Sequence, residues 1–439
     1  MNQGIAPSQQ PSISVEQSAE KIVNGLDGIT KAVCALKAEN QSLQHIYDQS
    51  VIHFLQLQED TETMKAMYHR LKAQFERMPQ QTSQTQTITN SEPQVNSNQI
   101  PLTTPSTGSS SHEALSLLNL PWDVTPSSYK SNINLRYSLH TDSYVCSVCF
   151  NFNGDCLAFA NRQTVFIVST QDGSVINTFE IPKAQEVTDY NTRAIRISPD
   201  SQFLALGGPV NNVLIYSIPS HRIIGDLEGH DNKVSSLLFS NDSNRLYSGG
   251  FDGLLCIWDL TNMKLLRKIN HENPESNKPG DDMIVALTKD DEETSIAVGF
   301  MNGTVGIYDP MCTQKMNVFK AHEEYLLDVT TSPLDCSIAT SSHDKTTKIW
   351  SLRYVASLRK TLVGHTDLVL STCFSPKETI CFTGSKDETI KAWDYKKGEC
   401  LFTIKAHTNT LFELAHHPSE KIFVSCSGDG LVCLWSYDI

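Results

Sequence analysis

Residues 365–394 of this 439-residue chain read HTDLVLSTCFSPKETICFTGSKDETIKAWD, and the spacing of their polar residues occurs in three further segments. In each copy a histidine stands 22 residues before an aspartate, and a tryptophan follows six residues after that aspartate. A serine or threonine lies four residues before each aspartate. The four sets are His230, Ser248, Asp252 and Trp258; His322, Thr340, Asp344 and Trp350; His365, Thr383, Asp387 and Trp393; and His407, Ser425, Asp429 and Trp435. Four recurrences in one register indicate a structural repeat.

The repeat extends beyond the four complete copies. An aromatic residue closes an apolar run at seven places, namely Phe166, Tyr216, Trp258, Tyr308, Trp350, Trp393 and Trp435. Their spacings of 50, 42, 50, 42, 43 and 42 residues are typical of repeats that each form one four-stranded blade. We therefore expect an all-β, seven-bladed WD-repeat β-propeller over residues 132–439. Repeats one, two and four have Ala160, Val210 and Asn302 at the aspartate position, and we expect these blades to be tied less firmly.

The repeat resembles the WD-repeat family, which implies that the four residues of each complete set form a hydrogen-bonded tetrad. In the expected chain of bonds the aspartate accepts from the imidazole, the imidazole donates onward to the hydroxyl, and the hydroxyl meets the indole N–H. Serine, histidine and aspartate also form hydrolase triads, but a catalytic triad has no reason to recur four times in one register. We expect structural tetrads, no catalytic residue and no cofactor.

Metal binding is not expected either. Cys146 and Cys149 form a CxxC pair, but no second pair of cysteines or histidines stands nearby at the spacing of a zinc site. The twelve cysteines are interpreted as reduced core residues of an intracellular protein.

Closure of the ring needs a strand from elsewhere, because only four residues follow Trp435 and the last blade has no sequence for its outer strand. Residues 132–139, NINLRYSL, precede the first repeat and alternate apolar and polar side chains as an edge strand does. The family resemblance implies that this strand completes the last blade. Closure would remove an open edge that favours aggregation.

A second periodicity occupies residues 14–79. From Ile22 to Met78, positions spaced alternately four and three residues apart are mostly apolar, and Pro79 ends the pattern. This spacing predicts a coiled-coil helix about 85 Å long whose apolar seam requires other helices, so we expect self-association. The oligomerisation residues include Leu26, Ile29, Val33, Leu36, Asn40, Leu43, Phe54, Leu57 and Leu71. Asn40 either fixes the register of the helices or is a tolerated, partly exposed polar residue, and the sequence leaves both open.

The remaining segments are expected to be connectors. We interpret residues 1–13 as disordered, 80–112 as a polar disordered linker of Gln, Ser, Thr, Asn and Pro, and 113–131 as a connecting segment. The formal net charge of −14 argues against direct nucleic-acid binding. No signal peptide and no membrane-spanning run is visible.

A coiled-coil stem, a polar linker and a C-terminal propeller together resemble the Tup/Groucho class of transcriptional corepressors. DSYVCSVCFNFNGDCLAFA in the first blade and ETMKAMYHRLKAQFE near the end of the helix carry the resemblance. It implies a nuclear tetramer that holds a TPR-repeat partner on its helix and DNA-binding repressors on its propeller. Histone tails and histone deacetylases are further partners that it implies.

Partners are expected on the face formed by the turns that contain the tetrad aspartates. Phe251, His343 and Lys386 directly precede those aspartates, Met301 occupies the matching position of blade four, and Tyr325 lies in the loop that enters blade five. Each could equally be an ordinary exposed loop residue. Two other coiled-coil and WD-repeat scaffolds stay open, namely an autophagy conjugation factor and a G-protein β-type adaptor.

Overall fold

The computed structural model describes residues 115–117, 121–126, 132–182, 192–207, 211–270, 282–352 and 356–439. The chain divides into two units, Met1–Ser106 and Thr107–Ile439, and all described residues belong to the second. The predicted helix of residues 14–79, its oligomerisation residues and the linker of residues 80–112 lie outside the described residues. The described part of the chain contains no helix that could cross a membrane.

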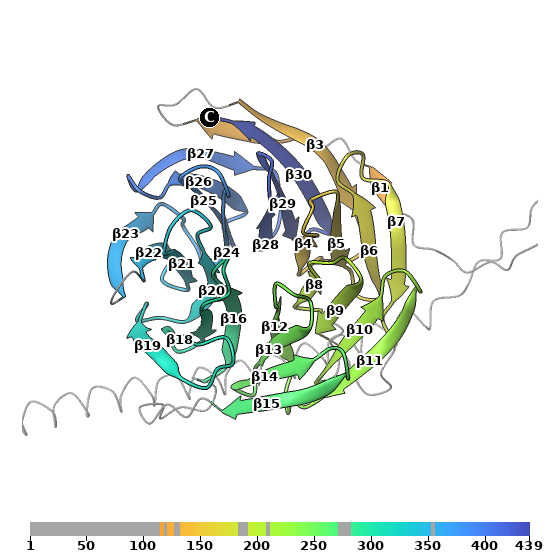
Figure 1. Cartoon of the computed structure of the whole chain (residues 1–439). Coiled ribbons are helices and arrows are strands. Elements are labelled where there is room, and N and C mark those ends of the chain that lie inside the picture. Colours follow the sequence, from red (N-terminus) through yellow and green to blue (C-terminus); the bar gives the residue numbers. More distant parts are fainter. Residues whose placement is uncertain are drawn as a thin grey trace, which may run out of the picture. The chain divides into compact units, whose positions relative to one another are not determined.

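Seven antiparallel sheets surround a central channel as the blades of a propeller (Figure 1). Blade one contains β4 (Val148–Phe150), β5 (Cys156–Ala160), β6 (Thr164–Ser169) and β7 (Val175–Glu180). Blade two contains β8 (Ile195–Ile197), β9 (Phe203–Gly207), β10 (Asn212–Ser217) and β11 (Arg222–Glu228). Blade three contains β12 (Val234–Phe239), β13 (Arg245–Gly250), β14 (Leu254–Asp259) and β15 (Lys264–Asn270). Blade four contains β16 (Ile284–Lys289), β17 (Ile296–Phe300), β18 (Thr304–Tyr308) and β19 (Lys315–Lys320).

The other three blades follow the same order from the channel outward. Blade five contains β20 (Leu326–Thr331), β21 (Ser337–Ser342), β22 (Thr346–Ser351) and β23 (Ser357–Val363). Blade six contains β24 (Val369–Phe374), β25 (Ile380–Ser385), β26 (Thr389–Asp394) and β27 (Glu399–Lys405), with β2 (Asp123–Pro126) added at its edge. Blade seven contains β28 (Leu411–His416), β29 (Ile422–Ser427), β30 (Leu431–Asp438), β3 (Asn132–His140) and β1 (Ser116–Leu117). In the described part of the chain the fold is therefore an all-β seven-bladed propeller.

The ring closes in blade seven. β3, which precedes the first repeat, pairs antiparallel with the C-terminal β30 from Asn132 opposite Asp438 to His140 opposite Leu431. The polar and apolar alternation of β3 fits this place in its first part, because Ile133 is buried while Asn134 and Arg136 are exposed. Towards the end of the strand both Ser138 and Leu139 are buried. The two ends of the propeller are thus held together by main-chain hydrogen bonds.

Two short strands lie in the segment that the sequence identified only as a connector. β1 pairs with β3, and β2 pairs with β27 over the register Asp123 opposite Lys405 to Pro126 opposite Phe402. Trp122, next to β2, places its ring edge-on against Trp435, with 5.7 Å between the ring centroids. This segment therefore covers the outer edges of blades six and seven.

The structure corrects the register of blade one. In blades two to six the third strand has a register shift directly before its repeat aromatic, as between Ile349 and Trp350. In blade one the corresponding shift falls before Val168, so Val168 and not Phe166 occupies the aromatic position. The aspartate position is then Arg162 instead of Ala160. A displacement of two residues keeps every side chain on the same face of a strand, which is why apolar patterning did not reveal it.

The hydrophobic core lies between neighbouring blades. One cluster joins Ile167 and Phe179 of blade one to Ile195 and Leu214 of blade two, and the other clusters repeat this arrangement around the ring. No blade buries its apolar faces alone, so the stability of each blade depends on the closed ring.

Candidate functional site

The four predicted tetrads assemble with one geometry. In each, the histidine Nδ1 lies 2.7–3.0 Å from the nearer aspartate oxygen and its Nε2 lies 2.7–2.8 Å from the serine or threonine hydroxyl. The tryptophan Nε1 donates to the same hydroxyl at 2.8–3.0 Å. The histidines and hydroxyls are buried. Each set therefore ties the third strand of a blade to its second strand and to the loop before its first strand.

The direction of one bond differs from the sequence expectation. Burial lowers the pKa of His322 more than its bonds to Asp344 raise it, so the imidazole is neutral and carries one N–H. That N–H donates from Nδ1 to Asp344, which leaves Nε2 as an acceptor. The Thr340 hydroxyl therefore donates to the imidazole while it accepts from Trp350.

The tetrad carboxyls are held in the ionised form. Burial alone would raise the pKa of Asp252 and Asp429, but hydrogen bonds from His230 and His407 and from nearby backbone N–H groups outweigh it and lower the pKa. Asp344 and Asp387 have lowered pKa values by the same balance, with threonine hydroxyls contributing. Because these folded-state values are depressed, the stabilisation is present above the ordinary carboxyl pKa and is lost as the pH falls through the folded-state values.

The five predicted partner-binding residues come together on one face. The backbone N–H groups of Phe251, His343 and Lys386 each donate at 2.9 Å to a carbonyl of the loop that enters the same blade, and that of Met301 does so at 2.8 Å. These bonds fix the turns that carry the side chains. Tyr325 is 50% exposed, and its ring lies 6.1 Å from that of His343. We call the surface formed by Phe251, Met301, Tyr325, His343 and Lys386 the tetrad face.

Two of these residues also line the channel. Phe251 and Met301 belong to the wall of a central cavity of about 540 Å³. The guanidinium of Arg193 lies 5.5 Å from the centre of the Phe251 ring, in the geometry of a cation–π contact. A similar pair, Arg162 over Tyr144 at 5.5 Å, lies between blades seven and one. Arg162 was not expected here, because the spacing from Phe166 puts Ala160 at the aspartate position of blade one.

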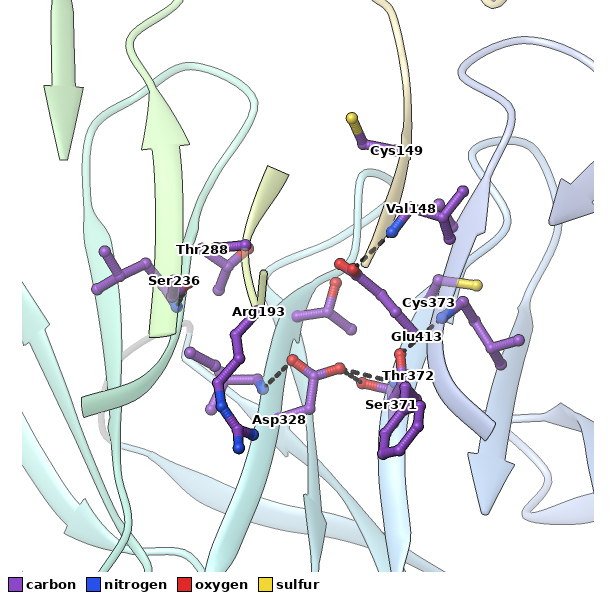
Figure 2. A pocket seen from close by; sticks show the side chains of 18 of the residues that line it. Val148, Cys149, Arg193, Ser236, Thr288, Asp328, Ser371, Thr372, Cys373 and Glu413 are labelled. Carbon is purple, nitrogen blue, oxygen red and sulfur yellow. Dashed lines mark hydrogen bonds between the residues drawn. The ribbon is translucent and has the colours of Figure 1, made fainter. Parts of the chain in front are cut away.

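A belt of polar side chains crosses the channel wall, where each member links its blade to the next. At five of the seven seams between neighbouring blades, a side chain of one blade accepts a hydrogen bond from a backbone N–H of the next blade. Figure 2 shows the bonds from the Val148 N–H to Glu413 and from the Thr372 N–H to Asp328. The bonds are Ser147 to Ile195 (3.1 Å), Ser236 to Leu287 (2.9 Å), Asp328 to Thr372 (2.7 Å), Ser371 to Leu414 (3.0 Å) and Glu413 to Val148 (2.9 Å). Ala194 and Ala286 occupy the equivalent positions of the other two blades.

Three of the groups at this level are charged. The Arg196 Nη2 lies 3.0 Å from Oε1 of Glu413, and both side chains are partly exposed to the cavity. Asp328 accepts from the N–H groups of Val329 at 2.8 Å and Thr372 at 2.7 Å. Burial raises the pKa of Asp328 to about 6, against the opposing effect of these donors and of Arg196. Sequence patterns did not indicate this charge cluster, because its members are 85 to 217 residues apart and differ in residue type.

The cysteines of the CxxC pair have no metal-binding surroundings. Cys149 is buried, and burial raises the pKa of its thiol to about 11. Within the described ranges, no group of histidine, cysteine, aspartate and glutamate side chains has the arrangement of a metal site.

Comparison with protein families identifies the repeat. The model of the WD domain, G-beta repeat, matches residues 221–259, 313–351, 356–394 and 398–436. The chain therefore carries WD-domain repeats over these four segments. The four matches contain the third strands of blades three, five, six and seven, which are the blades with complete tetrads.

Several curated proteins are similar to this chain at low identity. Periodic tryptophan protein 2 of Arabidopsis thaliana is 26% identical over 37% of this chain and 17% of its own length. Transcription factor unc-37 of Caenorhabditis elegans is 24% identical over 47% of this chain and 33% of its own. The U3 small nucleolar RNA-associated protein 18 homolog of Mus musculus is 23% identical over 43% of this chain and 33% of its own. The matches span a third or less of these relatives.

Proposed function

We propose that this protein is a non-enzymatic scaffold that represses transcription by binding DNA-binding repressors on the tetrad face. The observation that carries the proposal is the gathering of Phe251, Met301, Tyr325, His343 and Lys386 on one face of a ring that the tetrads make rigid. The similarity to transcription factor unc-37 supports a role in transcription, and the resemblance to the Tup/Groucho class supports corepression. The names of the small nucleolar and transcription relatives support a nuclear location.

The proposed assembly has two further parts. Residues 14–79 would form a homo-tetrameric helical stem that holds a TPR-repeat partner, and residues 80–112 would tether the propellers. Histone tails and histone deacetylases would be additional partners. Contact with nucleic acid would be indirect, since the net charge is −14.

The repressive activity can be tested by tethering. The full chain fused to a heterologous DNA-binding domain should lower the output of a nearby reporter several-fold. A double substitution, Phe251→Ala with Tyr325→Ala, should keep this tethered repression, because tethering replaces recruitment, yet lose binding to repressors in a two-hybrid assay. Unchanged reporter output with the fusion present in the nucleus would exclude the corepressor function.

The stem can be tested separately. Residues 14–79 alone should sediment as a helical oligomer, because a monomer would leave a long apolar seam in water. Leu36→Asp with Leu43→Asp, on the seam, should dissociate it, whereas Gln41→Asp, off the seam, should not. Sedimentation of the unsubstituted segment as a monomer would contradict the stem.

A further inference from the structure

The seam between blades five and six requires a hydrogen-bond acceptor at Asp328, but it does not require a carboxylate. Ser147, Ser236 and Ser371 accept the equivalent inter-blade hydrogen bond with a neutral hydroxyl. Asp328 makes the same bond to Thr372 but brings a charge into the channel wall, where desolvation disfavours it. The fold alone therefore does not account for an acid at this position.

In the described part of the chain Asp328 forms no ion pair with a cation, and Arg196 acts on it only from a longer distance. Its oxygens accept from the backbone N–H groups of Val329 and Thr372 and from the Thr372 hydroxyl. Arg196 is ion-paired to Glu413, and Arg193 lies at the mouth over the ring of Phe251, exposed to solvent. Figure 2 shows Asp328 and Glu413 both directed into the cavity. The three charged residues Arg196, Asp328 and Glu413 together carry a net charge of −1 when both acids are ionised.

On four of the seven blades, the wall between the tetrad face and these charged residues is apolar, whereas Cys146, Arg193 and Ser235 occupy the same level on blades one to three. Val285, Leu327, Leu370 and Phe412 are the second residues of β16, β20, β24 and β28, and all four are partly exposed to the cavity. Asp328 is the third residue of β20, so its Cα lies about 7 Å along the strand from the end near the tetrad face. An aliphatic stem with a charge at its tip matches this order of apolar wall and carboxylate.

We propose that the central channel receives a lysine or arginine side chain of a protein docked on the tetrad face, with Asp328 as its counter-ion. The aliphatic stem passes Phe251 and Met301 and packs on the four apolar residues of the channel wall named above. The cationic tip reaches Asp328. The cavity of about 540 Å³ holds such a side chain. This inference rests on the proposed function only for the source of the side chain, since small cations test the channel without any partner.

The test uses n-butylammonium and n-butylguanidinium as probes and the full-length protein. Saturation-transfer NMR titrations at pH 7.5 should show saturable binding of both cations and none of the neutral n-butanol. Asp328→Ser, which keeps an acceptor for the Thr372 N–H as in the serine blades, should weaken binding at least tenfold. The same change at the half-buried Asp367, whose carboxylate lies 3.9 Å from Lys386 on the tetrad face, should leave the affinity unchanged. Arg193→Gln should tighten binding by removing a repelling charge.

Acidification gives an independent readout. Protonation of Asp328 should release the cations as the pH falls through about 6, and Asp328→Ser should abolish this dependence. The other titratable or charged groups lining the cavity are Arg193, Arg196, Cys146, Cys149, Cys373, Glu413 and His416, and burial keeps the pKa of His416 near 4. Equal affinity in the wild type and Asp328→Ser, or no saturable binding to the wild type, would overturn the proposal. Loss of reporter repression with intact probe binding would overturn the proposed function alone.

A melting experiment shows whether the variant is folded. Because the folded-state pKa of Asp328 is raised, its contribution to stability is present below pH 4 and is lost as the pH rises through about 6. The Asp328→Ser variant should therefore have a melting temperature no lower than that of the wild type at pH 7.5. Its melting temperature relative to that of the wild type should rise as the pH increases from 4 to 7. If it melts well below the wild type, Asp328→Asn, which keeps a carbonyl oxygen for Thr372, decides the binding test.

Discussion

Deletion of residues 1–140 should abolish cooperative folding of the propeller, whereas deletion of residues 1–131 should preserve it. The longer deletion removes β3 and leaves β30 as an open edge in blade seven. It also removes the buried Ile133 and Leu139 and the bond from the Tyr137 hydroxyl to the Ser169 carbonyl at 2.9 Å. The buried side chains alone contribute roughly 1.5–3 kcal/mol each, and a domain has only about 5–15 kcal/mol in total.

The measurement is thermal unfolding by circular dichroism, with size-exclusion chromatography to detect association through the open edge. The shorter deletion is the matched control, because it also removes β1 and β2 but keeps β3. A synthetic peptide of residues 132–140 in excess should restore a cooperative transition to the longer deletion. A longer deletion that melts at the temperature of the shorter one would show that β3 is not needed for closure.

Trp435→Ala should cost about 3–5 kcal/mol of the free energy of unfolding, the range for a large aromatic residue in a core. Trp435 is fully buried, stacks on Phe423 with 6.2 Å between centroids, and donates to Ser425 at 3.0 Å. The substitution leaves a cavity in the blade that closes the ring and removes one member of its tetrad. The expected loss is therefore a large fraction of the total stability.

Two control variants separate the causes in denaturant unfolding. Trp435→Phe keeps an aromatic ring but loses the indole donor, so it should cost about 1–3 kcal/mol, the range for a disrupted buried hydrogen bond. Trp122→Ala removes a ring that contacts Trp435 from a position 36% exposed, and its effect should be smaller than that of Trp435→Ala. Equal losses for Trp435→Ala and Trp435→Phe would mean that the hydrogen bond, and not the packing, dominates.

The tetrads and the blade count were accessible from the sequence because they depend on local spacing. Ser248 and Trp258 belong to adjacent strands of one hairpin and Asp252 lies in the turn between them. His230 precedes them by a fixed length of chain, so one repeat contains all the partners. Blade one has no such constellation. Its aromatic position was placed at Phe166 instead of Val168, because a strand shifted by two residues shows the same apolar alternation.

The repeat and the residues of the tetrads follow from the amino-acid sequence, since both depend on spacings within about 50 residues. The strand that closes the ring pairs with a strand about 300 residues away, and it was expected from the family resemblance and its own apolar and polar alternation. The pairing of β2 with β27 and the meeting of Arg196, Asp328 and Glu413 in the channel arise from the closed ring and were not expected from the sequence. Those contacts join different blades, where Ser, Asp and Glu can accept the same backbone hydrogen bond. The properties of these side chains depend on which N–H group and which charge of the next blade lie opposite them in the closed ring. A pattern within one blade does not contain that information.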